Sequence, residues 1–234
     1  MRKAIVAVLI SGALVVSAET ARADGDTPPF AAMAPIERYL TADRNQEIVL
    51  ARSAAPASIS GDAAILVLTR KGYEVAAEGK NGFTCLVERG WMAPLDGPDF
   101  MDPNLRGPVC YNAVAVRTHL PYVFNRTRLA LAGRDREQMR GEIAHQVATK
   151  ELPVPEPGGM SYMTSKEQAL GRNGHWHPHV MVHLPRTDAA VWGANFPGSR
   201  VFADPTQEKD PEPETTFFVV VDSWSDGTRP DHDH

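Results

Sequence analysis

The chain has 234 residues, of which 43% are hydrophobic, and its formal net charge is −5. An acidic chain without a run of basic residues gives no electrostatic basis for binding nucleic acid or an anionic membrane surface. Its length fits one hydrophobic core, because single cores extend to roughly 200 to 250 residues.

The first 23 residues predict a cleavable secretory signal. Arg2 and Lys3 precede an apolar stretch over residues 4–16, and the segment closes on Ala21-Arg22-Ala23. That stretch is too short to span a bilayer as a stable helix. We therefore expect an exported protein, periplasmic or extracellular, that has no membrane contact after cleavage.

The remaining chain divides by composition into three parts. Residues 24–34 are rich in proline and small side chains and predict a flexible leader. Residues 35–227 are expected to form a single domain. Residues 228–234 end in Asp-His-Asp-His and predict a disordered polar tail.

Three helical segments are expected before residue 72. Pro35 suits the first turn of a helix, and Asp43 with Gln46 three residues later is typical of a capping box. The apolar run over residues 63–68 is followed by Thr-Arg-Lys-Gly. Basic residues followed by glycine complement the free carbonyl groups at a helix C-terminus, so this run is predicted to be helical.

The next segment predicts a β-hairpin. Residues 73–78 and 83–88 flank Gly-Lys-Asn-Gly, and Asn-Gly tolerates the positive φ angles of tight hairpin turns. Residues 90–108, dense in proline, glycine and aspartate, are expected to form a long loop.

The chain contains just two cysteines, Cys85 and Cys110. In an exported protein they indicate one disulfide, and closing a loop of about 25 residues would stabilise the fold by roughly 3 kcal/mol. The competing interpretation is a thiolate metal site or a catalytic cysteine. It lacks a second cysteine close in sequence.

Helices are predicted again in the middle of the chain. Residues 111–132 form two helical pieces, separated at Pro121, which has no amide donor. Asp135 and Gln138 suit a second capping box, and an apolar stripe with a spacing of four residues follows them. The members of that stripe are Met139, Ile143 and Val147.

The last third is expected to be rich in strands. Strands are predicted over residues 159–165, 175–183 and 216–224, with a short extended piece over 191–195. The first two of these are expected to pair as a hairpin. The strand over 216–224 is apolar on both faces, which favours a central position in the sheet.

This order of elements predicts an α+β domain in which helices pack on an antiparallel sheet of about five strands. It resembles the element order of PAS, Cache and profilin-type folds, in which a central antiparallel sheet carries helices. A shared fold does not fix function.

Four short motifs carry a further resemblance. They are Met160-Ser161-Tyr162-Met163, Trp176-His177-Pro178-His179, Trp192-Gly193-Ala194-Asn195 and Trp224-Ser225-Asp226-Gly227. In these motifs the chain resembles a group of uncharacterised exported bacterial proteins, over about residues 56–227. The resemblance implies export and a single domain, and it assigns no functional residue.

The segment over residues 175–183 is the main candidate for a functional site. Because side chains alternate along a strand, four histidines and Met181 would share one face, while the apolar residues between them would face the core. His175, His177 and His179 are predicted to bind a transition metal, zinc or copper, since neutral imidazole is a strong ligand for both.

Chelation by all three histidines requires a bend, because full extension spreads their attachment points over roughly 13 Å. Pro178 is the candidate bend point. The alternative is a polar strand face on which histidine and methionine only fill space. His183 is assigned a structural role, and His119 and His145 are expected to be ordinary helix residues.

Two functions of other classes stay open. A hydrolytic enzyme could use the same histidines with Ser161 and either Asp222 or Asp226, although Met163 replaces the second glycine of a nucleophile elbow. A non-catalytic domain that binds a partner or a small ligand is the third possibility. The sequence contains no H-E-x-x-H motif, Walker loop or dinucleotide fingerprint.

Overall fold

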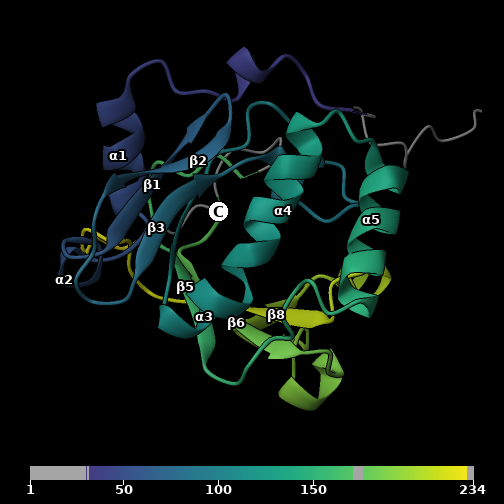
Figure 1. Cartoon of the computed structure of the whole chain (residues 1–234). Coiled ribbons are helices and arrows are strands. Elements are labelled where there is room, and N and C mark those ends of the chain that lie inside the picture. The colour runs from purple at the N-terminus through teal and green to yellow at the C-terminus, as the bar shows by residue number, and fades with distance from the viewer. Residues whose placement is uncertain (1–29, 31, 171–175, 231–234) are drawn as a thin grey trace, which may run out of the picture.

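The computed structural model describes residues 30, 32–170 and 176–230, which surround one β-sheet (Figure 1). The strand order is β2-β1-β3-β4-β5-β6-β8-β7. Neighbouring strands are antiparallel, apart from the parallel pair of β1 and β3. The expected α+β class is confirmed, but the described residues form eight strands where about five were expected. The predicted signal segment, most of the leader and the end of the tail lie outside the described residues.

The sheet consists of β1 (Ala64–Thr69), β2 (Gly72–Ala77), β3 (Thr84–Glu88), β4 (Gly107–Tyr111), β5 (Gly159–Met163), β6 (His179–Pro185), β7 (Val201–Ala203) and β8 (Glu214–Val220). The α-helices are α1 (Arg44–Arg52), α2 (Ala57–Ser60), α3 (Ala113–Thr118), α4 (Leu120–Leu131) and α5 (Arg136–Ala148). Short 3-10 helices are η1 (Ile36–Arg38), η2 (Gly90–Met92), η3 (Ala189–Trp192) and η4 (Pro205–Lys209). None of the described helices has the length and apolar character needed to cross a bilayer.

The run predicted to be a helix over residues 63–68 is strand β1, so that prediction was wrong. Its four central residues are buried and include Ile65 and Val67, whose branched side chains suit a strand covered on both faces. The basic pair after it serves a turn and does not end a helix. Thr69 pairs with Gly72, whose φ of 115° closes that turn.

The predicted hairpin was also wrong in its pairing. Both segments are strands, β2 and β3, but β1 lies between them in the sheet and pairs with each. Asn81 still shapes the connection, because its side chain accepts a hydrogen bond from the amide of Phe83 and donates one to the carbonyl of Ile59. The chain bends here as its residues predict, but β1 lies between the two strands that this bend connects.

Several local predictions are confirmed. α5 begins at a complete capping box formed by Asp135 and Gln138, and Met139 and Ile143 on its predicted stripe are buried. The chain between residues 111 and 132 contains two helices that meet at His119. β5 pairs with β6, and β8 lies between β6 and β7. The piece expected to be extended near residue 191 is instead the 3-10 helix η3.

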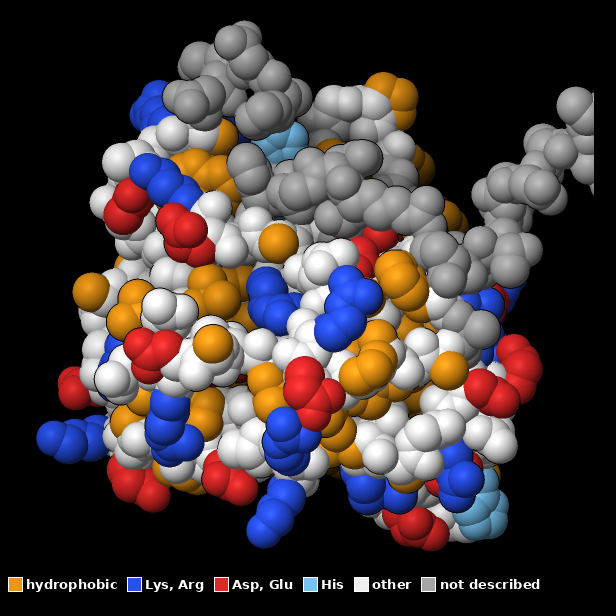
Figure 2. Space-filling model, turned by 90° about the horizontal axis from the view of Figure 1, so that it is seen from above, with side chains coloured by type: hydrophobic (Ala, Val, Ile, Leu, Met, Phe, Trp, Pro, Cys, Tyr) orange, Lys and Arg blue, Asp and Glu red, His pale blue; other side chains and the backbone are white. Residues whose placement is uncertain are grey.

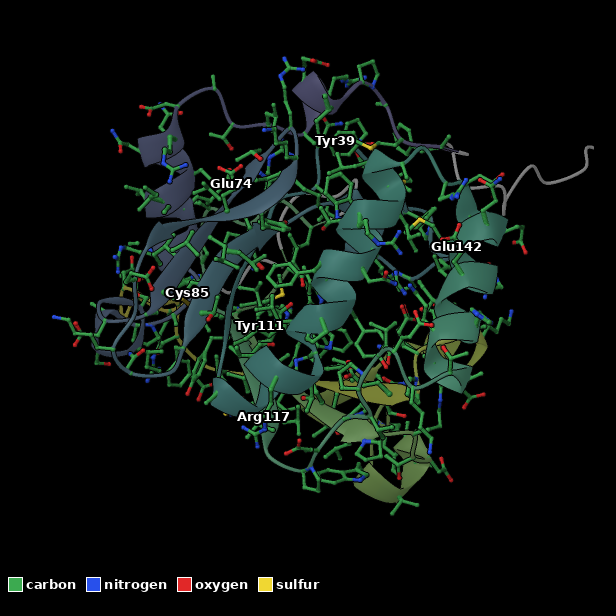
Figure 3. The ribbon with its side chains drawn as sticks, in the orientation of Figure 1. Tyr39, Glu74, Cys85, Tyr111, Arg117 and Glu142 are labelled. Atoms are coloured by element: carbon green, nitrogen blue, oxygen red, sulfur yellow. A yellow bond between two sulfur atoms is a disulfide. The ribbon has the colours of Figure 1, made fainter. Side chains whose placement is uncertain are left out.

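Helices cover both faces of the sheet. α3, α4 and α5 pack on one face, and α1 and α2 lie on the other (Figure 1). The surface seen from above carries hydrophobic side chains among charged groups of both signs (Figure 2). Tyr111 lies in the interior, between the sheet and the α3–α4 region (Figure 3). The α3–α4 face therefore encloses the interior in which the polar side chains described below are found.

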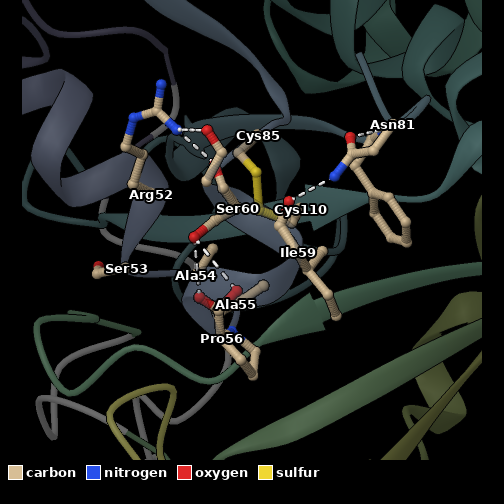
Figure 4. Close-up of a disulfide and its surroundings, with 12 residues drawn as sticks. Arg52, Ser53, Ala54, Ala55, Pro56, Ile59, Ser60, Asn81, Cys85 and Cys110 are labelled. Atoms are coloured by element: carbon tan, nitrogen blue, oxygen red, sulfur yellow. Dashed lines mark hydrogen bonds between the residues drawn. A yellow bond between two sulfur atoms is a disulfide. The ribbon is translucent and has the colours of Figure 1, made fainter. Parts of the chain in front are cut away.

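The predicted disulfide between Cys85 and Cys110 is present. The two residues lie opposite each other in β3 and β4, and both are fully buried. The segment that joins α1 to α2 covers the bond (Figure 4). The disulfide fixes β3 to β4 on the opposite face of the sheet from Tyr111, the residue that follows Cys110.

Candidate functional site

The histidine-rich strand directs its imidazoles toward the helices. In β6, His179, Met181 and His183 are buried, whereas Val180 and Val182 between them are only partly buried. The predicted sharing of one face is confirmed for these three residues. The apolar residues of the other face also contact a core, because Val182 and Leu184 pack against a smaller hydrophobic cluster around Phe217, while Met181 packs in the α3–α4 core.

His183 is one member of a buried cluster with His119 and Glu214. The Nδ1 atoms of His119 and His183 lie 2.9 Å and 3.0 Å from the same Oε1 atom of Glu214. One ligand atom from each of the three residues lies within 4.8 Å of the others. Such a group could hold a metal ion.

Each member of the cluster is positioned by its own element. His183 pairs across the sheet with Thr216, and Glu214 lies two residues earlier on the same face of β8. His119 occupies the junction of α3 and α4, and Pro121 lies in the first turn of the second helix. The imidazole rings of His119 and His183 are 4.1 Å apart, centroid to centroid.

Two hydroxyl groups complete the hydrogen bonding of the cluster. Thr216 donates to Oε1 of Glu214 over 2.7 Å. Ser161, which is fully buried in β5, lies 3.0 Å from Nε2 of His183 through its Oγ. The hydroxyl of Tyr111 donates to Glu88, and the Tyr111 ring lies 5.2 Å from that of His119. These contacts restrict the orientation of both imidazoles.

The electrostatics of the cluster are dominated by one buried carboxylate. Burial alone would raise the pKa of Glu214, but the charges and hydrogen bonds of His119 and His183 hold it well below its usual value. Burial alone would lower the pKa of His119, but Glu214 outweighs burial and raises it. Burial and the charge on His119 lower the pKa of His183. Without a metal, therefore, the pKa of His119 lies above that of His183, and His119 keeps its proton to higher pH.

A small cavity of about 90 Å³ opens beside the cluster and is lined by His119 and Glu214 themselves. Its wall includes Arg126, whose Nε donates to Oε1 of Glu212 over 2.7 Å. The other carboxylate oxygen of Glu212 is buried without a hydrogen-bond partner. Burial raises the pKa of Asp210, on the same wall, to about 6. The cavity gives two members of the cluster access to a small ligand.

The acidic wall follows from the sequence Asp-Pro-Glu-Pro-Glu over residues 210–214. A residue before proline is restricted to extended conformations, and side chains alternate along an extended chain. Asp210, Glu212 and Glu214 accordingly all line the cavity. This alternation is readable in the sequence.

The residues singled out from the sequence are placed differently. His175 lies outside the described residues. Nδ1 of His179 donates to the carbonyl oxygen of His177 over 2.8 Å, and the ring of His179 packs 4.8 Å from that of Trp176. The metal set of His175, His177 and His179 therefore stays a prediction, and the cluster that the structure brings together contains none of the three.

The expected hydrolytic partners are also separated. Asp222 pairs with Arg200, and Asp226 lies 2.8 Å from Lys166. The hydrogen-bonded sequence of serine, imidazole and carboxylate is formed by Ser161, His183 and Glu214 instead. A structural role was expected for His183 and an ordinary helix position for His119. Nothing local to either histidine reveals its partner Glu214, which lies 31 positions after His183 and 95 after His119.

No protein-family model, curated protein sequence or solved structure shows significant similarity to the chain. The resemblance to exported bacterial proteins therefore stays a prediction from four short motifs. Any functional conclusion depends on the side chains themselves.

Proposed function

We propose that this protein is an exported metal-binding protein that holds a divalent transition-metal ion through His119, His183 and Glu214. The observation that carries the proposal is the convergence of two imidazole Nδ1 atoms on one buried carboxylate oxygen. Three ligand atoms this close need only small adjustments to surround an ion at about 2.0 to 2.2 Å.

The ligand set favours zinc. Two imidazoles and a carboxylate form a typical set for zinc sites that keep one position open, whereas copper(I) is favoured by thioether or thiolate ligands. The cavity beside His119 and Glu214 provides room for water or a ligand at that open position. The hydroxyl of Ser161 would accept a hydrogen bond from Nε2 of His183 and so direct Nδ1 toward the ion.

Metal binding would replace the proton that His119 carries in the metal-free protein. Both imidazoles must be neutral to act as ligands, and Glu214 already is a carboxylate. Because Glu214 raises the pKa of His119, protons compete with metal up to a pH above the ordinary 6.5. Affinity should therefore rise with pH through the neutral range.

Thermal and chemical unfolding with and without zinc test the proposal. The mature protein, ended before Asp231 to remove the tail histidines, should gain about 2.7 kcal/mol of unfolding free energy at a hundredfold excess over the dissociation constant. His119→Gln and Glu214→Gln should each abolish this gain. His145→Gln, on the exposed surface of α5, is the matched control and should retain it.

The triple replacement of His175, His177 and His179 by glutamine separates the two candidate sites. If this variant loses the zinc-dependent gain and His119→Gln keeps it, the ion is bound by the histidine-rich strand and the present proposal is wrong.

A second candidate function rests on the chain of hydrogen bonds from Ser161 through His183 to Glu214. It has the connectivity of nucleophile, base and orienting carboxylate. Complete burial of Ser161 argues against it, because a substrate carbonyl must reach Oγ. Covalent labelling of Ser161 by a fluorophosphonate, lost in His183→Gln, would favour hydrolysis. Absence of labelling leaves metal binding as the function of the cluster.

A further inference from the structure

A second, larger recess lies between α4 and the turn that joins β1 to β2. Its volume is about 360 Å³, within the range of small-molecule sites. Arg70, Lys71 and Tyr73 form one side, and Phe124 and Arg128 form part of the other. None of these residues belongs to the proposed metal site.

One wall of this recess is a stripe on α4, apolar at Phe124 and Leu131. Phe124, Arg128 and Leu131 are spaced by four and three residues, so they lie on one side of the helix. Most of α4 is buried, yet 43% of Phe124 is exposed. The ring of Tyr73 lies 6.4 Å from that of Phe124, at a tilt of 47°. An aromatic surface is thus left open to solvent.

The charged part is entirely basic. Arg70, Lys71 and Arg128 line the recess, and none of the described carboxylates does, although the whole chain is acidic. Arg70 pairs with Glu37, which lies outside the lining. Within the described part of the chain, neither Lys71 nor Arg128 forms an ion pair. Arg128 donates instead to the side-chain oxygen of Asn125 over 2.8 Å.

Lys71 and Arg128, which have no carboxylate partner among the described residues, lie beside an exposed aromatic surface, and the chemistry of a ligand follows from this combination. An arginine fork and a lysine ammonium group favour a carboxylate, and an aromatic ring of the ligand would cover Phe124 and Tyr73. We propose that the recess between α4 and the β1–β2 turn binds a small aromatic carboxylate.

Titration of the mature, isotopically labelled protein with phenylacetate, followed by NMR, tests the proposal. Phenylacetate should shift the amide signals of Lys71, Tyr73 and Phe124. Its neutral analogue phenylacetamide, and acetate, which lacks the ring, should bind about tenfold more weakly. The experiment is run without and with zinc, so that its outcome is independent of the metal site.

Matched variants locate the site. Arg128→Glu should weaken phenylacetate binding about tenfold and Phe124→Ser about fivefold. Arg117 is an exposed arginine of α3 that pairs with Glu156, and the control variant Arg117→Glu should leave binding unchanged. Equal binding of phenylacetamide, unchanged binding in both recess variants, or no binding of phenylacetate would each overturn the proposal.

Discussion

Two buried clusters in this protein each combine a glutamate with basic side chains, but they differ in their surroundings. In the first, the guanidinium of Arg89 binds both carboxylate oxygens of Glu47, at 2.7 Å and 2.9 Å, and the side chains are 0% and 3% exposed. Arg89 also donates to the carbonyl oxygens of Tyr39 and Val87, and Thr41 donates to Glu47. The second is the cluster of His119, His183 and Glu214.

The difference lies in access and in the protons involved. The Arg89–Glu47 pair is almost completely shielded from solvent, and arginine does not lose its proton at accessible pH. The histidine cluster borders a cavity and can exchange its proton for an ion. Burial of charge therefore does not identify a functional site on its own, because the pair anchors the chain and the cluster is available for chemistry.

The largest effect is expected at the pair. Glu47→Gln leaves the charge of Arg89 buried without a counterion, which should lower the unfolding free energy by about 3 to 5 kcal/mol in urea titrations. Glu142→Gln breaks the exposed pair with Arg134 and should cost under about 1 kcal/mol. Zinc affinity of the folded Glu47→Gln protein should be unchanged. A loss of stability equal to that of the control would contradict the comparison.

His179 offers a third environment, a buried imidazole beside Phe218 and Trp176. Burial lowers its pKa to about 4, so the unfolded chain takes up the proton first as pH falls below 6.5. Stability from this residue is present above pH 6.5 and is lost toward pH 4. Between pH 7 and pH 4.5 the wild type should lose about 2 kcal/mol more than His179→Phe. Parallel pH profiles of the two proteins would show that His179 is not buried as described.

Ser161→Ala tests whether the hydroxyl beside His183 positions that ligand. The loss of its hydrogen bond to Nε2 should weaken zinc binding about 10-fold to 100-fold by calorimetry. Ser165→Ala removes another fully buried hydroxyl, which bonds Ser53 and not the cluster, and should leave zinc affinity unchanged. Equal affinities of the two variants would remove Ser161 from the site.

The smallest effect concerns the metal-free protein. The pKa of His119 is raised by Glu214, so its stabilising charge is present below pH 6.5 and is lost as pH rises through the raised value. The pKa of Glu214 is lowered, so its contribution is present above its usual value and lost in acid. The difference in unfolding free energy between wild type and His119→Gln, with chelator present, should therefore be largest between about pH 4.5 and 6.5. A difference that grows toward pH 8 would contradict this assignment.

Local chemistry predicted the parts of the fold that depend on neighbours in sequence. The capping box at Asp135, the pairing of Cys85 with Cys110 and the shared face of His179 and His183 all follow from spacing or elimination. The position of β1 between β2 and β3 did not, because a Gly-Lys-Asn-Gly turn does not reveal that the preceding buried strand pairs with both of the strands that the turn joins.

The cluster of His119, His183 and Glu214 was not predicted from the sequence for the same reason. His119 terminates one helix and Glu214 begins a strand, and neither neighbourhood indicates the other. The one available signal was the alternation of carboxylates and prolines before β8, which marks an acidic face without naming its partner.

Because Glu214 belongs to β8, the cluster is complete only when this strand has joined the sheet. The carboxylate lies 95 residues after His119 and 31 after His183, and β8 is the last strand in the described chain. Contacts between such distant segments form late, because long loops must close before they do. An ion would therefore bind tightly only after β8 has been added beside β6. Occupancy of the site would then report completed folding, and a chain arrested before that step would be released without its metal.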